Sequence, residues 1–135
     1  MKFLKTFILM VFMIVTYTNA NAQFKLAQWP ELKVFHGVMS ETFHPSEEGN
    51  LEPIKTRCTE MYEKAVAVSK STMPTELKAK KGIKTAVADL VKGTKELDEI
   101  IKTKATDEVI KAKLTALHDT FHKIIETCNK QNEQH

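Results

Sequence analysis

The sequence is poor in glycine and lacks the short motifs that mark the common nucleotide-binding and hydrolytic enzymes. It contains four glycines in 135 residues, and none of them belongs to a phosphate-binding loop or a dinucleotide fingerprint. It has no GxSxG sequence and no plausible Ser-His-Asp arrangement. We therefore expect neither nucleotide-dependent nor serine-hydrolase chemistry, and we predict that the protein is not an enzyme.

Arginine-rich stretches and long runs of one charge are also missing. Lysines are spread among acidic residues along every segment, and aromatic residues are not interleaved with them. The formal net charge of +3 falls to about +1 if Lys2 and Lys5 are removed with an N-terminal signal. We therefore expect no nucleic-acid partner.

The first 22 residues have the pattern of a secretory signal peptide. A short basic segment precedes an apolar run over 7–15 that is too short to cross a bilayer. Ala20-Asn21-Ala22 supplies the small-x-small pattern that signal peptidase recognises. The sequence predicts a signal peptide at 1–22 and a periplasmic or secreted domain at 23–135 without membrane contact. A retained membrane helix is the alternative.

Apolar residues recur at steps of three and four through the mature chain, which is the spacing of amphipathic helices. The first helix is expected to end near His44, because Pro45 disfavours helical geometry before it. Short links with turn residues separate the helices. The sequence predicts an all-α, antiparallel, up-down-up-down four-helix bundle, with helices at about 30–44, 51–69, 76–103 and 107–128.

Histidines occur beside or within two of these apolar seams. The seam of the first helix steps through Trp29, Leu32, His36, Met39 and Phe43. A histidine in such a position must be hydrogen-bonded, bound to metal or held neutral at a cost. In the last helix His118 and His122 lie four residues apart, and therefore on one face. Two imidazoles so placed can bind one metal ion, or they can simply line a helix–helix contact.

The rise of ~1.5 Å per helical residue places five metal-ligating residue types at similar heights in the bundle. These residues are His36, Met39, Cys58, His118 and His122. We therefore predict a Cu or Zn centre bound by the three histidines, with Met39, Cys58 or His44 completing the ligand shell. Imidazole accepts Zn or Cu, whereas thioether and thiolate favour Cu(I).

The two cysteines would ordinarily suggest a disulfide in an exported protein. The same helical rise separates Cys58 from Cys128 by roughly 12 Å, more than the ~7 Å between Cα atoms that a bridge allows. We therefore expect two free thiols. A shifted alignment of the helices, which would allow the bridge, is the alternative.

A signal peptide, an antiparallel bundle, a methionine in the first helix and a histidine late in the last helix resemble the soluble periplasmic haem-b cytochrome. Cytochrome c prime is similar in fold. The resemblance implies haem b with Met39 and His122, or His118, as axial ligands, and a redox partner protein. No CxxCH motif is present, so covalently attached haem is not expected. His36 and the second of the paired histidines have no role in such a site and suit Cu or Zn better.

Three functions therefore compete at this point. They are a transition-metal-binding bundle, a haem-b electron carrier, and a structural or interaction bundle whose polar core residues specify register. A di-iron enzyme is disfavoured, because the helices lack the repeated Glu-x-x-His set of di-iron bundles. Both a monomer and a homodimer are compatible with the sequence.

Overall fold

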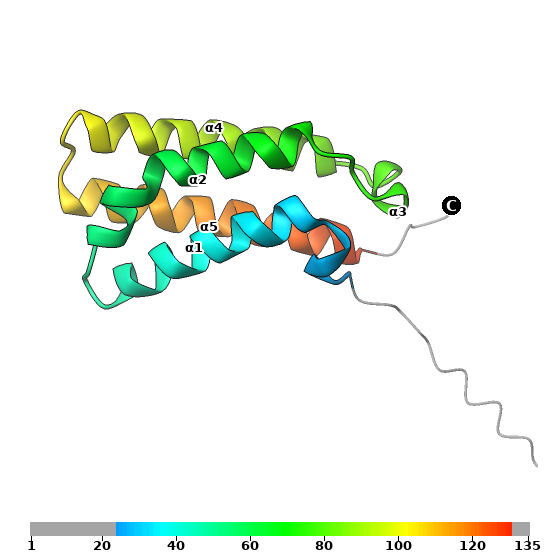
Figure 1. Ribbon diagram of the computed structural model, residues 1–135, viewed down its shortest axis with the longest axis horizontal. Coiled ribbons are helices and arrows are strands. Elements are labelled where there is room, and N and C mark those ends of the chain that lie inside the picture. The colour runs from blue at the N-terminus through cyan, green and yellow to red at the C-terminus, as the bar shows by residue number, and fades with distance from the viewer. Residues whose placement is uncertain (1–23, 131–135) are drawn as a thin grey trace, which may run out of the picture.

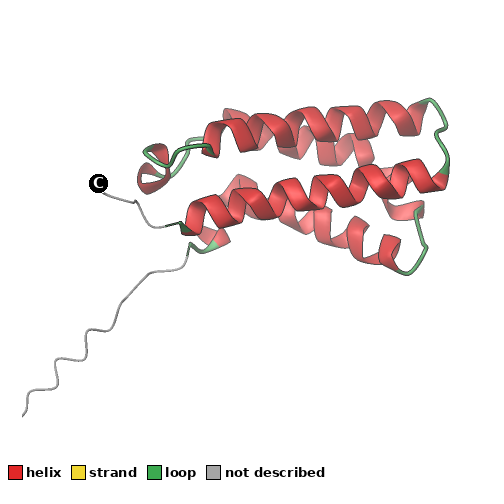
Figure 2. Cartoon of the chain, turned by 180° about the vertical axis from the view of Figure 1, so that it is seen from behind, coloured by secondary structure: helices red, strands yellow, loops and turns green. Residues whose placement is uncertain are grey.

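The computed structural model describes residues 24–130, so the predicted signal peptide lies outside the described residues. The described chain is helical throughout, with no strand between residues 24 and 130 (Figure 2). Its elements are the 3-10 helix η1 (Leu26–Gln28) and the helices α1 (Pro30–Glu47), α2 (Glu52–Lys70), α3 (Thr75–Lys78), α4 (Ile83–Lys102) and α5 (Asp107–Asn129).

The four long helices pack side by side, and each runs opposite to the long helix before it (Figure 1). Helix α1 contacts α2 and α5, and α4 contacts the same two helices from the other side. The short α3 lies at one end of the bundle, where α2 ends and α4 begins (Figure 1). The predicted all-α bundle is confirmed. None of the described helices is long and apolar enough to cross a membrane.

Helix α1 continues through Pro45 to Glu47, so the prediction that it ends near His44 is wrong. Pro45 removes only one backbone hydrogen bond in the last turn, where carbonyl groups can face water. The chain turns away just after the helix at Gly49, whose φ of +87° is the left-handed conformation that commonly follows a helix end. This extra turn places Glu47 beside His44 on the same helix.

The predicted helix over 76–103 is divided in two by a turn, so that prediction is wrong at its start. Gly82 has a φ of +89° and forms the N-cap of α4, a conformation that side chains disfavour. Leu77 of α3 is nevertheless buried and anchors the turn to the core. The link before α4 is therefore a packed segment and not the first turn of a long helix.

The core follows the predicted seams closely in α2 and α5. The apolar residues that recur at steps of three and four in these two segments are all buried: Leu51, Ile54, Cys58, Met61, Ala65 and Val68, and Ile110, Leu114, Leu117, Phe121, Ile124 and Cys128. Trp29 is 1% exposed, and its Nε1 donates to Ser71 Oγ at 2.7 Å. The Thr106 hydroxyl accepts a hydrogen bond from the Val109 backbone N–H and so caps the start of α5.

Candidate metal centre

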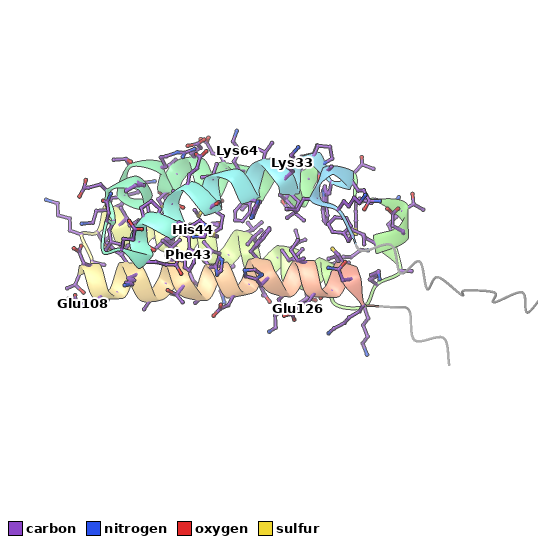
Figure 3. The ribbon with its side chains drawn as sticks, turned by 90° about the horizontal axis from the view of Figure 1, so that it is seen from below. Lys33, Phe43, His44, Lys64, Glu108 and Glu126 are labelled. Atoms are coloured by element: carbon purple, nitrogen blue, oxygen red, sulfur yellow. The ribbon has the colours of Figure 1, made fainter. Side chains whose placement is uncertain are left out.

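The seam between α1 and α5 is filled by aromatic rings. The centroids of Phe35 and Phe121 lie 5.9 Å apart across it, and both side chains are buried. The two helices make fewer close backbone approaches than the other neighbouring pairs, since rings occupy the space between them. Figure 3 shows α1 and α5 from this side, with Phe43 labelled between them. We call this region, with its histidines, the aromatic seam.

Two imidazole rings pack on these phenyl rings. The rings of Phe43 and His118 are stacked, with centroids 3.8 Å apart and an interplanar angle of 7°. His36 stacks on Phe121 with a centroid distance of 5.1 Å. The sequence predicted a core position for His36, but Phe35 is the fully buried residue and His36 lies partly exposed at the edge. The stacking fixes one face of each imidazole and leaves its nitrogens at the border with solvent.

The paired histidines of α5 meet directly. Nε2 of His122 lies 3.1 Å from Nε2 of His118, and the two rings are nearly perpendicular at 78°. Two nitrogens bound to one tetrahedral ion at ~2.0–2.1 Å would lie about 3.3 Å apart. The observed separation is therefore already close to that of two imidazoles sharing an ion. It equally fits one N–H···N hydrogen bond between neutral rings.

The surroundings favour the neutral, metal-binding form of His36 and His118. Burial lowers the pKa of His36, and repulsion from His122 and then His44 adds to the effect. Burial also lowers the pKa of His118, with a further contribution from His122, while Asp119 opposes the shift. The pKa effects also show that the histidines of α1 lie close enough to those of α5 to interact electrostatically.

His44 stands at the end of the seam and is exposed to solvent. Its Nδ1 lies 3.0 Å from a carboxylate oxygen of Glu47, three residues on in the same helix. This pair was not predicted, because the first helix was expected to end near His44. Had the helix been extended by one turn, the three-residue spacing would have predicted the contact.

Met39 and Cys58 belong to the apolar core and not to the border where the imidazole nitrogens lie. They are 1% and 2% exposed. Burial and, to a lesser extent, the nearby Asp98 carboxylate together raise the pKa of the Cys58 thiol to about 12. Metal binds the thiolate, so this environment disfavours Cys58 as a ligand. Both cysteines are free in the structure.

The histidines do not form a closed ligand shell. Among residues 24–130, no group of three or more His, Cys, Asp or Glu side chains is placed to hold a metal ion. The structure brings His118 and His122 together and sets His36 and His44 within electrostatic range of them. A third ligand would therefore have to come from a rotation of a histidine side chain of α1, or from water.

A haem between Met39 and His122 does not fit this arrangement. Met39 is enclosed in the core, and Nε2 of His122 faces His118. The buried rings of Phe35 and Phe121 occupy the seam that the macrocycle would have to enter. Binding haem would require these rings to move apart, at the cost of packing that contributes to the core.

No family model, no curated protein and no solved structure matches this chain. The function is therefore inferred from the residues of the aromatic seam alone. The fold by itself is compatible with many functions, because four-helix bundles are used for several unrelated ones.

Proposed function

We propose that this protein is an exported four-helix bundle that binds one transition-metal ion, Zn or Cu, through His118 and His122. His36 or His44 supplies a further ligand from α1, and water completes the shell. The observation that supports this proposal is the 3.1 Å separation of the two Nε2 atoms. Export rests on the signal-like pattern of residues 1–22.

The donor set favours divalent ions. Imidazole is a good ligand for Zn(II) and Cu(II), whereas Cu(I) prefers sulfur. The two candidate sulfur ligands, Met39 and Cys58, are enclosed in the core, and the Cys58 thiol resists ionisation. An open site with two or three imidazoles is suited to carrying or sensing an ion more than to redox chemistry.

The lowered pKa values of His36 and His118 support binding near neutral pH. Neutral imidazole binds metal, so an ion and protons compete for the same nitrogens. We expect affinity to fall as the pH drops below about 6.5, the ordinary histidine pKa, with part of the affinity retained somewhat below it.

The test is calorimetric titration of the purified chain with Zn(II) and Cu(II) at pH 7. His118→Ala and His122→Ala should each abolish stoichiometric binding, because each removes half of the chelating pair. The matched control is His135→Ala, which changes a histidine outside α1 and α5. If the control weakens binding as much as His122→Ala does, the site is not the one proposed.

His36→Ala and His44→Ala identify the ligand from α1. A severe loss in one of them assigns the third position to that residue, whereas unchanged affinity in both removes α1 from the site. Absence of binding in the wild type would leave the structural bundle as the function. A Soret band after incubation with haem would instead favour the cytochrome hypothesis.

A further inference from the structure

A second concave site lies near the α3 end of the bundle and shares no residue with the aromatic seam. It has a volume of about 430 Å³, within the range typical of small-molecule pockets. Its wall comes from the start of α1, the end of α2, the α2–α4 link and the first half of α4. The lining residues are Trp29, Val68, Ser69, Ser71, Met73, Lys78, Lys84, Val87 and Ala88.

The inner part of this pocket is apolar. Val68 and Val87 are core residues, and Met73 packs against the core while remaining partly exposed. Ala88 is exposed at the wall formed by α4. A ligand would therefore meet aliphatic surface over most of its body, and burial of its own apolar groups would drive binding.

The hydroxyl and indole groups of the wall already donate hydrogen bonds within the protein. Trp29 Nε1 donates to Ser71 Oγ at 2.7 Å, and Ser71 Oγ donates to the Val68 carbonyl at 2.7 Å. Ser69 Oγ likewise donates to the Val66 carbonyl at 2.7 Å. The side-chain donors left for a ligand are the two lysine ammonium groups, which pair best with an anionic acceptor.

Both lysines are available for such a contact. Lys78 and Lys84 are exposed, and neither forms an ion pair or a side-chain hydrogen bond within the part of the chain that the structure describes. The surrounding segment, residues 70–84, carries five lysines and only one acidic residue. No acidic residue lines the pocket. This end of the bundle therefore attracts anions.

We infer that this pocket binds a small amphipathic organic anion. The apolar body of the ligand lies against Met73, Val87 and Ala88, and its anionic headgroup contacts the ammonium groups of Lys78 and Lys84. The shared chemistry is one anionic headgroup on a short hydrocarbon body. The inference does not depend on the proposed metal site.

Trp29 is the only tryptophan of the chain and lines the pocket, so its fluorescence reports on occupancy. The probes are octanoate, octyl phosphate, octanol and octylammonium, which share one chain length and are used below their micellar concentrations. Octanoate or octyl phosphate should change the fluorescence saturably, whereas octanol and octylammonium should bind more weakly. Comparing the two anions distinguishes carboxylate from phosphate as the preferred headgroup.

Two variants and one control locate the binding. Lys78→Gln combined with Lys84→Gln should weaken anion binding about tenfold, because two partly solvated charge contacts are lost. The control Lys123→Gln removes an exposed lysine of α5 and should have no effect. Ala88→Phe fills the pocket from an exposed position and should block binding without disturbing the fold.

Three results would overturn the inference. They are equal affinity for octanoate and octylammonium, unchanged octanoate affinity in the double lysine variant, and unchanged affinity in Ala88→Phe. Circular dichroism of each variant checks that the helices remain intact. Saturable, anion-selective binding that both variants weaken would establish the pocket as a ligand site.

Discussion

Two seams of the bundle differ in how far their polar side chains are hydrogen-bonded within the protein. The seam between α2 and α4 is built largely from aliphatic residues and contains a buried carboxylate, Asp98. The aromatic seam between α1 and α5 contains imidazoles. In the first seam every polar group has partners within the protein. In the second, ring nitrogens remain without them.

The polar groups between α2 and α4 satisfy one another. Asp98 accepts hydrogen bonds from Thr59 at 2.8 Å and from Lys102 at 2.5 Å. The buried Thr94 donates to the Leu90 carbonyl at 2.9 Å. Across residues 24–130 no buried side-chain nitrogen or oxygen lacks a partner. Such a closed network stabilises the fold and leaves nothing for a ligand.

The imidazoles of the aromatic seam form fewer hydrogen bonds with the protein. His118 contacts His122 through one nitrogen, and His36 has no hydrogen bond among the described residues. Their ring faces, in contrast, are fixed by stacking on Phe43 and Phe121. Fixed ring planes with uncommitted nitrogens are what a binding site requires, because orientation is set before the ligand arrives. The polar groups between α2 and α4 therefore stabilise the fold, whereas the aromatic seam carries the metal site that we propose.

Thiol reactivity gives the largest expected effect. Burial raises the pKa of Cys58 to about 12 and that of Cys128 to about 11. At pH 8 the thiolate of Cys58 is therefore about a thousandfold scarcer than that of an ordinary thiol with a pKa of 9.0. A colorimetric thiol reagent should react extremely slowly with the folded protein, and most slowly with Cys58.

In guanidinium chloride without reductant, both thiols should react at once. Finding no free thiol in the unfolded monomer would show a disulfide and contradict the structure. Rapid reaction of Cys58 in the folded state would show that the α2–α4 seam opens easily. In that case the closed network does not have the stabilising role assigned to it.

Removal of a seam ring should cost the most stability. Phe121→Ala deletes a buried ring that contacts Phe35 and His36, and we expect a loss of about 3–5 kcal/mol in the free energy of unfolding. The counterpart in α4, Leu90→Ala, should cost about 2–5 kcal/mol. Urea denaturation followed by circular dichroism measures both. A loss below about 1 kcal/mol in Phe121→Ala would mean that the seam is loosely packed.

Asp98→Ala should have a smaller effect, about 1–2 kcal/mol, because water can hydrate the exposed Thr59 and Lys102 once the carboxylate is gone. Burial alone would raise the pKa of Asp98, but hydrogen bonds from Lys102 and Thr59 and the charge of Lys102 outweigh it and lower the pKa. The stabilisation is therefore present above the ordinary aspartate pKa and is lost as the pH falls through the lower folded value. Asp89→Ala, an exposed acid of α4, is the control and should change little. An equal loss in both variants would contradict a specific role for Asp98.

The sequence predicted the helices well because amphipathic periodicity is a local property. Every predicted seam residue of α2 and α5 is buried. The errors lie where one residue determines the outcome. Pro45 was expected to end α1, but an exposed last turn tolerates the missing hydrogen bond. Gly82 was expected to lie within a helix, but its positive φ closes a turn instead.

The candidate site was predicted in part. Heights along a helix follow from the rise per residue, and the structure brings the side chains of His118 and His122 together. The direction in which a side chain faces around its helix is harder to predict than its height. An error of one residue in the seam of α1 places His36 in the core where the structure has Phe35. Cys58 was grouped with the histidines because residues at the same height along the bundle can lie either in the core or at its border with solvent. Side-chain packing decides that distinction, and periodicity alone does not encode it.

The last prediction concerns pH and the aromatic seam in the absence of metal. The pKa values of His36 and His118 are lowered in the folded protein, first by burial and then by His122. The unfolded chain therefore binds protons more tightly than the folded one just below pH 6.5. Stability should be constant above that pH, should decrease as the pH falls from about 6.5 to the lower folded pKa values, and should level off below them.

Thermal unfolding with a chelator present, from pH 7.5 to pH 5, measures this decrease. His36→Gln and His118→Gln cannot be protonated, so each should flatten the pH dependence, and the double variant should flatten it more. His135→Gln is the matched control and should keep the wild-type slope, because it changes a histidine outside the sequence of α1 and α5. Identical slopes in the wild type and the double variant would show that these imidazoles are fully solvated. The aromatic seam would then not differ from the α2–α4 seam in the way described, because water would satisfy the imidazole nitrogens.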